Sequence, residues 1–495
     1  MSRTDQALPP PLDGMTVEEP ARSETRSPGA VAASVVRSSG TAIAGGLVSQ
    51  ALKAAVMIYV ARAFGTADFG SFSFANSVNA FLFMFAQFGL PVFGVREVAQ
   101  AGHLERGLLR AITEARLLLA VSGTVVALAV LYFVPGVTRI EFWLVAGFGL
   151  SNVALSGFFD WAFQGMGRLH LWATINITWQ ALWLVFTMVT FYAHGSITLV
   201  SFGFAAAALV AGMLGWPWLR RLMHSPAETA SVHTYSVRSV IGASANLGVG
   251  TLLITVLVWT DTIIVRLVAG QQAVGAYAAG NRVALALAML ASFYVMGAFP
   301  KLSKSAMKSP QEYSKNFQRA YEHLAILFLP GIFWAVFYAP QIMVVLFRRP
   351  DYLAGVAVFR IFQVFLWLNI IGNLYGMGGL VAHRKDHAYR RALVISGGAL
   401  LVLCPVVTLR WGLAGAALAV VFCQGISLAL FMVETRHFVR AEHFKALGPP
   451  ALIGIALVLA AAAFHLRFWS SVAALVLAYL IILVWRHPVL YPVTG

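Results

Sequence analysis

The chain has 495 residues, of which 59% are hydrophobic and only 11% are charged, and its formal net charge is +16. Soluble domains carry roughly 25% charged residues, so this composition excludes a large soluble protein. The two cysteines, Cys404 and Cys423, both lie inside apolar runs. They are expected to be packing residues, which excludes a disulfide framework and a cysteine-based metal site.

The first 36 residues are rich in proline, serine, glutamate and arginine, and they predict a disordered cytoplasmic tail. This stretch lacks the basic region followed directly by an apolar region that a cleavable signal peptide needs. The first membrane-spanning helix is therefore expected to act as its own signal.

Long apolar runs then recur to the end of the chain, and a bilayer-spanning helix needs roughly 20 mostly apolar residues. The runs predict an all-α polytopic integral membrane protein with 14 transmembrane helices. The predicted spans are 40–61, 71–94, 112–134, 140–160, 171–193, 197–218, 240–268, 273–299, 321–346, 353–378, 391–409, 411–433, 448–466 and 468–485. We expect a first six-helix lobe over residues 37–235 and a second over residues 236–440. Residues 441–495 are expected to hold the last two helices and a short cytoplasmic tail.

The basic residues predict the orientation, because lysine and arginine favour cytoplasmic loops. The loops after even-numbered helices carry 19 lysines and arginines, against 7 for the loops and flanks after odd-numbered helices. Both termini are therefore expected in the cytoplasm. Such a basic balance does not indicate a nucleic-acid partner.

A short glycine-rich connection occurs twice. "ARAFGTADFGSFSFANSV" at residues 61–78 aligns without a gap with part of "VRLVAGQQAVGAYAAGNRV" at residues 265–283. Gly65 matches Gly270 and Gly70 matches Gly275, each pair 205 residues apart. Because an even number of helices separates the copies, both keep the same orientation. This predicts a parallel duplication, an arrangement used by alternating-access transporters.

These stretches, together with "VREVAQ", "FPKLSK" and "GLVAHRKDHAYRRALVISG", resemble the polysaccharide-transporter branch of the MOP (multidrug/oligosaccharidyl-lipid/polysaccharide) superfamily. The resemblance covers roughly residues 38–435. It implies a flippase that moves undecaprenyl-diphosphate-linked sugars to the outer leaflet of a bacterial inner membrane, as O-antigen flippases of the Wzx type do. It further implies a V-shaped, two-lobed fold, with the last two helices offering a groove for the lipid tail.

The implied partners are the lipid-linked oligosaccharide diphosphate and membrane lipids, with a polysaccharide polymerase and chain-length proteins as candidates. No cofactor and no nucleic acid are implied. The sequence contains no Walker A loop, no G-x-S-x-G and no HExxH, and its carboxylates are too scattered for an acid–base pair. We therefore expect a transporter and not an enzyme.

Charges within the predicted spans are the candidate site residues, since each needs a partner or a water-filled cavity. The predicted cavity cations are Lys53, Arg116, Arg266, Arg282 and Arg360. The acids taken as candidates beside them are Asp160 and Asp261. An excess of cations suits an anionic ligand such as a diphosphate, whose oxygens arginine can bind bidentately.

The repeat also suggests a coupling device. Shifting Asp261 back by 205 residues places it at Val56, three residues after Lys53, and such positions share a helix face. Lys53 and Asp261 are therefore predicted to project toward the same axis from opposite lobes and to attract one another as the lobes approach.

Three other functions remain open. A multidrug exporter of the MATE type would be expected to use embedded carboxylates, of which Asp261 is the one clearly deep example. A membrane-embedded glycosyltransferase or ligase would need paired acids or a sizeable outer loop. A scaffold or an uncoupled scramblase would not need the embedded charges.

Overall fold

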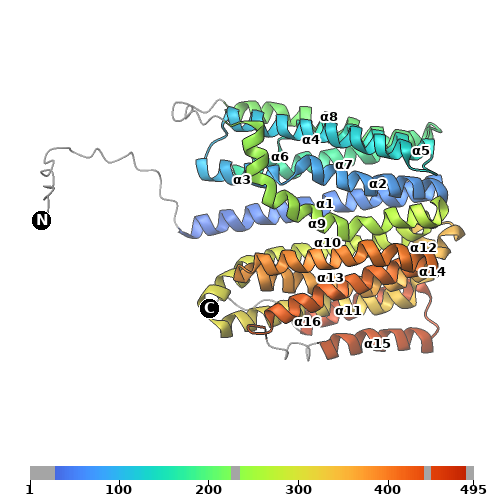
Figure 1. Ribbon diagram of the computed structural model, residues 1–495. Coiled ribbons are helices and arrows are strands. Elements are labelled where there is room, and N and C mark those ends of the chain that lie inside the picture. Colours follow the sequence, from blue (N-terminus) through green and yellow to red (C-terminus); the bar gives the residue numbers. More distant parts are fainter. Residues whose placement is uncertain (1–27, 224–234, 440–446, 486–495) are drawn as a thin grey trace, which may run out of the picture.

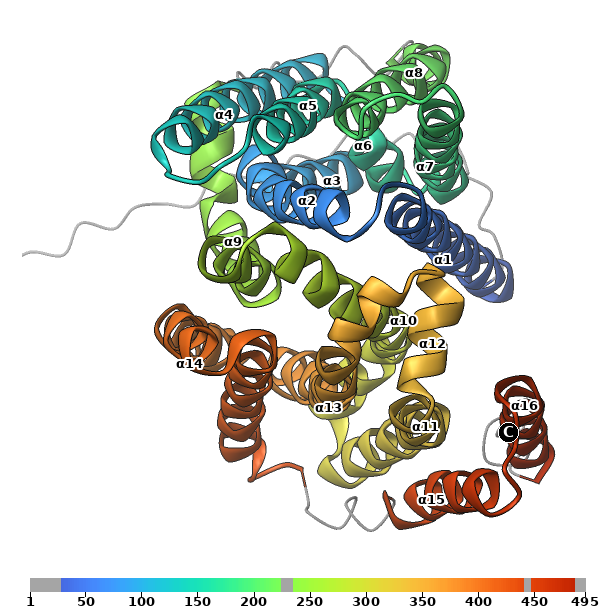
Figure 2. The same ribbon diagram turned by 90° about the vertical axis from the view of Figure 1, so that its right-hand side faces the viewer.

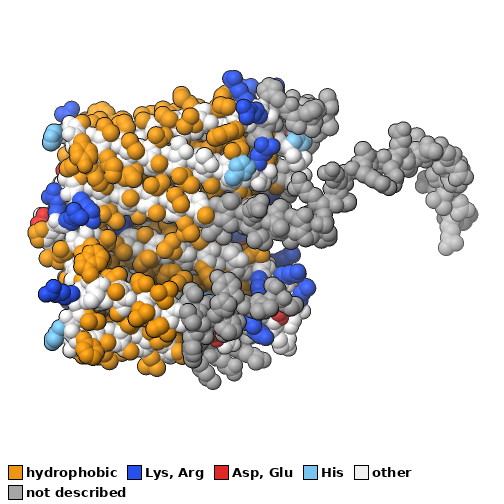
Figure 3. Space-filling model, turned by 180° about the vertical axis from the view of Figure 1, so that it is seen from behind, with side chains coloured by type: hydrophobic (Ala, Val, Ile, Leu, Met, Phe, Trp, Pro, Cys, Tyr) orange, Lys and Arg blue, Asp and Glu red, His pale blue; other side chains and the backbone are white. Residues whose placement is uncertain are grey.

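The structure, a computed structural model, describes residues 28–223, 235–439 and 447–485. Most of the predicted tail lies outside these ranges, as do residues 486–495, while residues 28–36 form the start of the first helix. All regular structure in the described residues is helical, and the apolar side chains form a broad band between two ends where the charges gather (Figure 3). This is the pattern of a polytopic membrane protein.

The helices form two lobes that lie side by side (Figures 1 and 2). One apolar core gathers mainly residues between 56 and 240, and a second gathers residues between 265 and 439. The first lobe contains α1 (Pro28–Phe64), α2 (Thr66–Gln87), α3 (Leu90–Ala101), α4 (Arg106–Phe133), α5 (Arg139–Ser156), α6 (Asp160–Gly165), α7 (Leu169–Tyr192) and α8 (Thr198–Met223). The second lobe contains α9 (Val237–Ala269), α10 (Gln271–Lys308), α11 (Pro310–Phe337), α12 (Ala339–Phe347), α13 (Val356–Asn373) and α14 (Asp386–Thr435).

A final pair, α15 (Gly448–Ala463) and α16 (Phe468–Trp485), packs on α11 (Figure 2). Ten helices in the described ranges are long and apolar enough to cross a membrane. The longest, α14, folds back at Gly412, so that Ser427 donates a hydrogen bond to Ser396. It therefore supplies two spans, and α5, α15 and α16 complete the predicted fourteen.

The duplicated connection has the same geometry in both lobes. Gly65 (φ 89°, ψ 178°) separates α1 from α2, and Gly270 (φ 89°, ψ 179°) separates α9 from α10. This region of φ favours glycine, which has no Cβ to clash. Both connections lie at one end of the molecule, which we call the Gly65 face (Figure 1). The duplication is therefore parallel, as predicted.

Several predicted boundaries were wrong. The connection between the first two helices is a single residue and not a loop of about ten. The second span breaks at Phe88 and Gly89, which both have positive φ, and resumes as α3. The predicted span 321–346 is α11 followed by α12, and α11 starts eleven residues earlier, where Ser309 caps the helix and Pro310 begins it. Its first turns are polar, so hydropathy did not reveal them.

Candidate functional site

Two cations from opposite lobes lie near one another at the lobe interface. Lys53 of α1 lies within electrostatic range of Arg282 of α10. The guanidinium carbon of Arg282 is 4.5 Å from the ring centre of Trp259, and its Nη2 is 3.5 Å from Ser77 Oγ, the limit of a hydrogen bond. The buried Nε of Arg282 has no hydrogen-bond partner. Two neighbouring cations with an unsatisfied donor form a place where an anion would be stabilised.

Asp261, 2% exposed on α9, takes its hydrogen bonds within the second lobe. Its Oδ2 accepts a hydrogen bond from the Tyr277 hydroxyl at 2.6 Å. Its Oδ1 accepts from the backbone N–H of Thr262 at 2.6 Å and from the Thr262 hydroxyl at 3.2 Å. Arg282 lies within electrostatic range of this carboxylate. The ion pairs of the described residues do not include one between Asp261 and Lys53.

Two other predicted cavity cations lie apart from this pair. Arg116 of α4 is 2% exposed and donates a hydrogen bond at 2.8 Å to the Phe158 carbonyl, with Asp160 in electrostatic range. All three residues belong to the first lobe. Arg360 is exposed on α13 and donates to the Val336 carbonyl of α11 at 3.2 Å. The structure therefore brings Lys53 and Arg282 together, but not Arg116 or Arg360.

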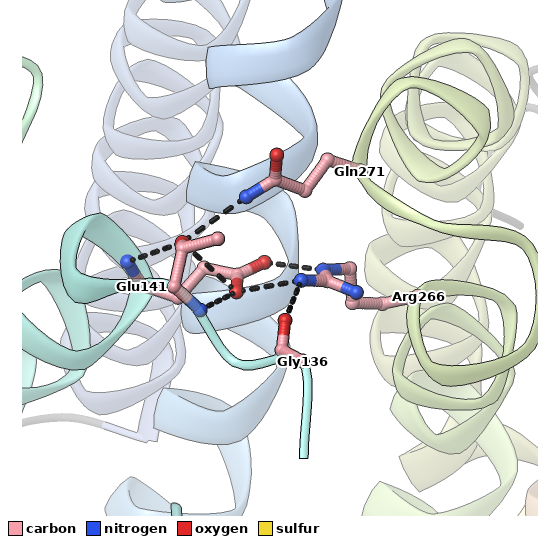
Figure 4. A network of polar contacts seen from close by, with 5 residues as sticks. Gly136, Glu141, Arg266 and Gln271 are labelled. Carbon is pink, nitrogen blue, oxygen red and sulfur yellow. Dashed lines mark hydrogen bonds and ion pairs between the residues drawn. The ribbon is translucent and has the colours of Figure 1, made fainter.

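Arg266, the fifth predicted cation, joins the two lobes at the Gly65 face (Figure 4). Its Nε and Nη2 both donate to the carboxylate of Glu141 at the start of α5, the second at 2.9 Å. Its Nη2 also donates to the Gly136 carbonyl at 2.8 Å, and nearby Gln271 donates to the Thr138 hydroxyl at 3.0 Å. Glu141 is fully buried. This bidentate ion pair connects α9 to the loop before α5.

A second set of contacts joins the lobes on the other side of the same face. The Arg62 side chain donates to the Leu346 and Val345 carbonyls at the end of α12, at 2.6 and 2.9 Å. Arg349 donates in return to the Arg62 carbonyl at 3.0 Å, and the Tyr352 hydroxyl donates to the Ala61 carbonyl at 2.8 Å. The last carbonyls of a helix lack intrahelical partners. Each lobe therefore supplies donors to a helix terminus of the other.

Sequence reasoning missed Glu141, Trp259 and the Arg349–Tyr352 contacts. A local signal existed for Glu141, because "TRIE" at residues 138–141 is a capping box before an apolar run. The structure shows that box, with the Thr138 backbone N–H donating to Glu141 Oε2 at 2.9 Å. Nothing in the sequence indicates that Arg266, 125 residues later, pairs with it.

Comparisons with solved structures agree on the fold. The structure titled "Lipid II flippase MurJ, inward closed conformation" is similar with a TM-score of 0.68 at 13% identity, covering 90% of this chain and 99% of that one. The eukaryotic MATE transporter AtDTX14 is similar with a TM-score of 0.58 at 12% identity, covering 85% and 98%. A MOP superfamily transporter from Pyrococcus furiosus gives a TM-score of 0.55 at 14% identity, covering 83% and 96%.

Sequence comparison points the same way. The protein named "Putative O-antigen transporter" from Escherichia coli (strain K12) is 21% identical over 393 residues, which cover 77% of this chain and 91% of that protein. The family model described as polysaccharide biosynthesis protein matches residues 35–306, more than half of the chain. The chain therefore belongs to the polysaccharide biosynthesis protein family and has the two-lobed fold of the MOP superfamily.

Proposed function

We propose that this protein is a flippase that moves an undecaprenyl-diphosphate-linked oligosaccharide from the inner to the outer leaflet of a bacterial inner membrane. In this proposal the Gly65 face points outward and both termini are cytoplasmic, as the distribution of basic residues predicts. The family and the similarity to flippases and transporters support the general activity. The cargo and the roles of individual residues are the finer part of the proposal.

The observation that carries the cargo assignment is the proximity of Lys53 and Arg282 from different lobes, while the nearby carboxylate of Asp261 accepts its hydrogen bonds from Tyr277 and Thr262. The mutual repulsion of the two cations disfavours close approach of the lobes at this level. A diphosphate bound between them would replace repulsion by attraction to both lobes and would satisfy the free Nε of Arg282. Occupancy by the anion would thereby favour the conformation in which the lobes are close.

The membrane potential supports the same direction of transport. Moving one charge through 100 mV is worth about 2.3 kcal/mol, so an inside-negative potential helps to move a diphosphate outward. A cationic drug would be driven the other way and would meet Lys53 and Arg282 as like charges. The arrangement therefore favours an anionic cargo over the cations that a MATE-type exporter expels.

The direct test is complementation of a strain that lacks the gene. We expect loss of the surface polysaccharide and accumulation of its lipid-linked unit in the inner leaflet. Lys53→Ala and Arg282→Ala should each fail to restore the polysaccharide at normal protein levels. Lys304→Ala is the matched control, because Lys304 is an exposed cation on the same helix as Arg282. Normal polysaccharide in the deletion strain, with altered drug resistance, would contradict the proposal.

A binding measurement on the purified protein separates recognition of the cargo from folding. Undecaprenyl diphosphate should bind more tightly than undecaprenyl monophosphate, and Arg282→Ala should remove that difference. Equal affinity of both lipids for the unaltered protein would show that the neighbouring cations do not recognise the diphosphate.

A further inference from the structure

The lobes meet at the Gly65 face through two chemically different contacts. The ion-pair latch consists of Glu141 and Arg266. The carbonyl latch consists of Arg62, Arg349 and Tyr352 with the backbone carbonyls that they bind. We propose that these two latches together form the outer gate, which holds the lobes closed at this face and must open before cargo can leave. The inference rests on the proposed function for the outward orientation of the Gly65 face and for transport, but it does not depend on the identity of the cargo.

The positions of the latches support a gate. Arg266 lies one helical turn before Gly270, and Arg62 lies just before Gly65. Each latch therefore ties the end of the first helix of one lobe to the other lobe, α9 to the loop before α5 and α1 to the segment after α12. Lobe separation at this face must break both, because no contact of either latch lies within a single lobe except the capping box of Glu141.

That capping box makes the ion-pair latch reversible. When Arg266 leaves, the Glu141 carboxylate keeps the backbone N–H and the hydroxyl of Thr138 as donors, at 2.9 and 3.1 Å from Oε2. The Glu141 carboxylate therefore still accepts hydrogen bonds after Arg266 leaves, and the start of α5 stays capped. Arg266 also lies 5.9 Å from the ring centre of Phe74 on α2, so this cation–π contact joins the lobes in the closed state as well.

In the carbonyl latch, side chains of each lobe donate hydrogen bonds to a helix C-terminus of the other lobe. Arg62 binds the last carbonyls of α12, and Arg349 and Tyr352 bind the last carbonyls of α1. A positive side chain is favoured at a helix C-terminus by the free carbonyls and by the helix dipole. Both termini lie at the end of the molecule, where water can replace these donors upon opening. This latch contains no carboxylate, so its opening leaves no countercharge unpaired.

The test uses the purified full-length protein with spin labels on Ala193→Cys and Arg410→Cys. Both positions are exposed and belong to different lobes: Ala193 follows α7, and Arg410 lies two residues before the reversal of α14 at Gly412. The native cysteines are buried. Double electron–electron resonance then measures the distance between the two spin labels, which reports the separation of the lobes at this face. The unaltered protein should give mainly the short distance of the closed face.

Glu141→Gln should raise the ratio of open to closed lobes by at least about tenfold, because breaking a buried pair leaves Arg266 without its countercharge. Glutamine keeps the capping box, so the start of α5 remains intact. Glu114→Gln is the matched control: it removes the exposed Arg110–Glu114 pair, which lies within α4. Tyr352→Phe should shift the distances in the same direction as Glu141→Gln, and Glu114→Gln should not shift them.

A reversible cross-link tests the gate by holding it closed. A bifunctional methanethiosulfonate reagent that joins Glu141→Cys to Arg266→Cys should stop transport in cells, and a reductant should restore it. Distances unchanged in Glu141→Gln and Tyr352→Phe would overturn the proposal, and so would transport that continues through the cross-linked protein. If neither variant folds, the cross-link alone tests the proposal: blocked transport supports the gate, and continued transport overturns it.

Discussion

Gly70 of α2 and Gly275 of α10, which are equivalent in the repeat, lie against each other's helices in a reciprocal contact. A Cβ added at Gly70 would lie 1.9 Å from the Gln271 carbonyl oxygen, and one at Gly275 would lie 1.9 Å from that of Thr66. Thr66 and Gln271 are themselves 205 residues apart. The contact thus obeys a two-fold relation, and the helix backbones meet where no side chain fits.

We expect Gly70→Ala and Gly275→Ala to prevent this approach and to reduce transport. Overpacking of this kind costs about 1–3 kcal/mol, here at the closed face of the lobes. The closed population should fall in both variants, as measured by the distance between spin labels at residues 193 and 410. Gly297→Ala on α10 is the control, because no atom lies within 4 Å of its added Cβ. Equal transport in all three variants would show that the contact has no function.

Trp259 is expected to position Arg282 for anion binding. A cation over an indole ring is stabilised by about 0.5–2 kcal/mol, depending on its exposure to water. Trp259→Leu should therefore weaken binding of undecaprenyl diphosphate, while Trp259→Phe should retain part of the affinity. The affinity for undecaprenyl monophosphate provides the reference. If the leucine and phenylalanine variants bind equally, the ring face does not act on Arg282.

Exchange of the charges at residues 53 and 261 is expected not to restore transport. In this conformation Asp261 is hydrogen-bonded by Tyr277 and Thr262, and Lys53 lies near Arg282. A lysine at residue 261 would place a cation next to Arg282, and an aspartate at residue 53 would remove one of the neighbouring cations. The double variant Lys53→Asp/Asp261→Lys should be as inactive as each single one in complementation. Restored polysaccharide would instead support the direct pairing that the sequence suggests.

Tyr479 of α16 is expected to stabilise the docking of the final helix pair. Its hydroxyl donates to the Leu327 carbonyl at 2.8 Å and accepts from the Gly331 N–H at 3.1 Å, on either side of Pro330 in α11. Proline cannot donate the helical hydrogen bond and distorts the turn before it, so the hydroxyl inserts where the helix is weakened.

Tyr479→Phe should lower the stability of this contact by about 1 kcal/mol, near the range measured for interhelical hydrogen bonds in membranes. Hydrogen exchange in α11 should increase around residues 327–331. Tyr132→Phe, at a tyrosine that is 77% exposed, serves as the control. Unchanged exchange in the Tyr479 variant would show that the hydroxyl does not support α11.

The sequence predicted the helix number and the duplication because both depend on local features. Apolar runs specify spans, and Gly65 and Gly270 mark turns that only glycine adopts easily. It did not predict the break at Phe88, since the left-handed conformation there comes with packing of this residue against Gly248 of the other lobe. Residue spacing also indicated cationic positions, but it could not distinguish Arg266, which is hydrogen-bonded to a buried acid, from Arg282, whose nearby acid Asp261 is hydrogen-bonded by Tyr277 and Thr262 instead. That difference depends on contacts between distant parts of the chain.

The contact between Arg282 and Ser77 has a consequence for the origin of the protein. The two residues are 205 positions apart and therefore occupy equivalent places beside the two-fold axis. In a homodimer of a half-length ancestor, a residue at this place would face its own copy, because an isologous interface repeats every side chain. Arginine would then oppose arginine, and serine would oppose serine. A single chain that holds both halves is free of that restriction, so one guanidinium can stand beside the axis with a small hydroxyl opposite.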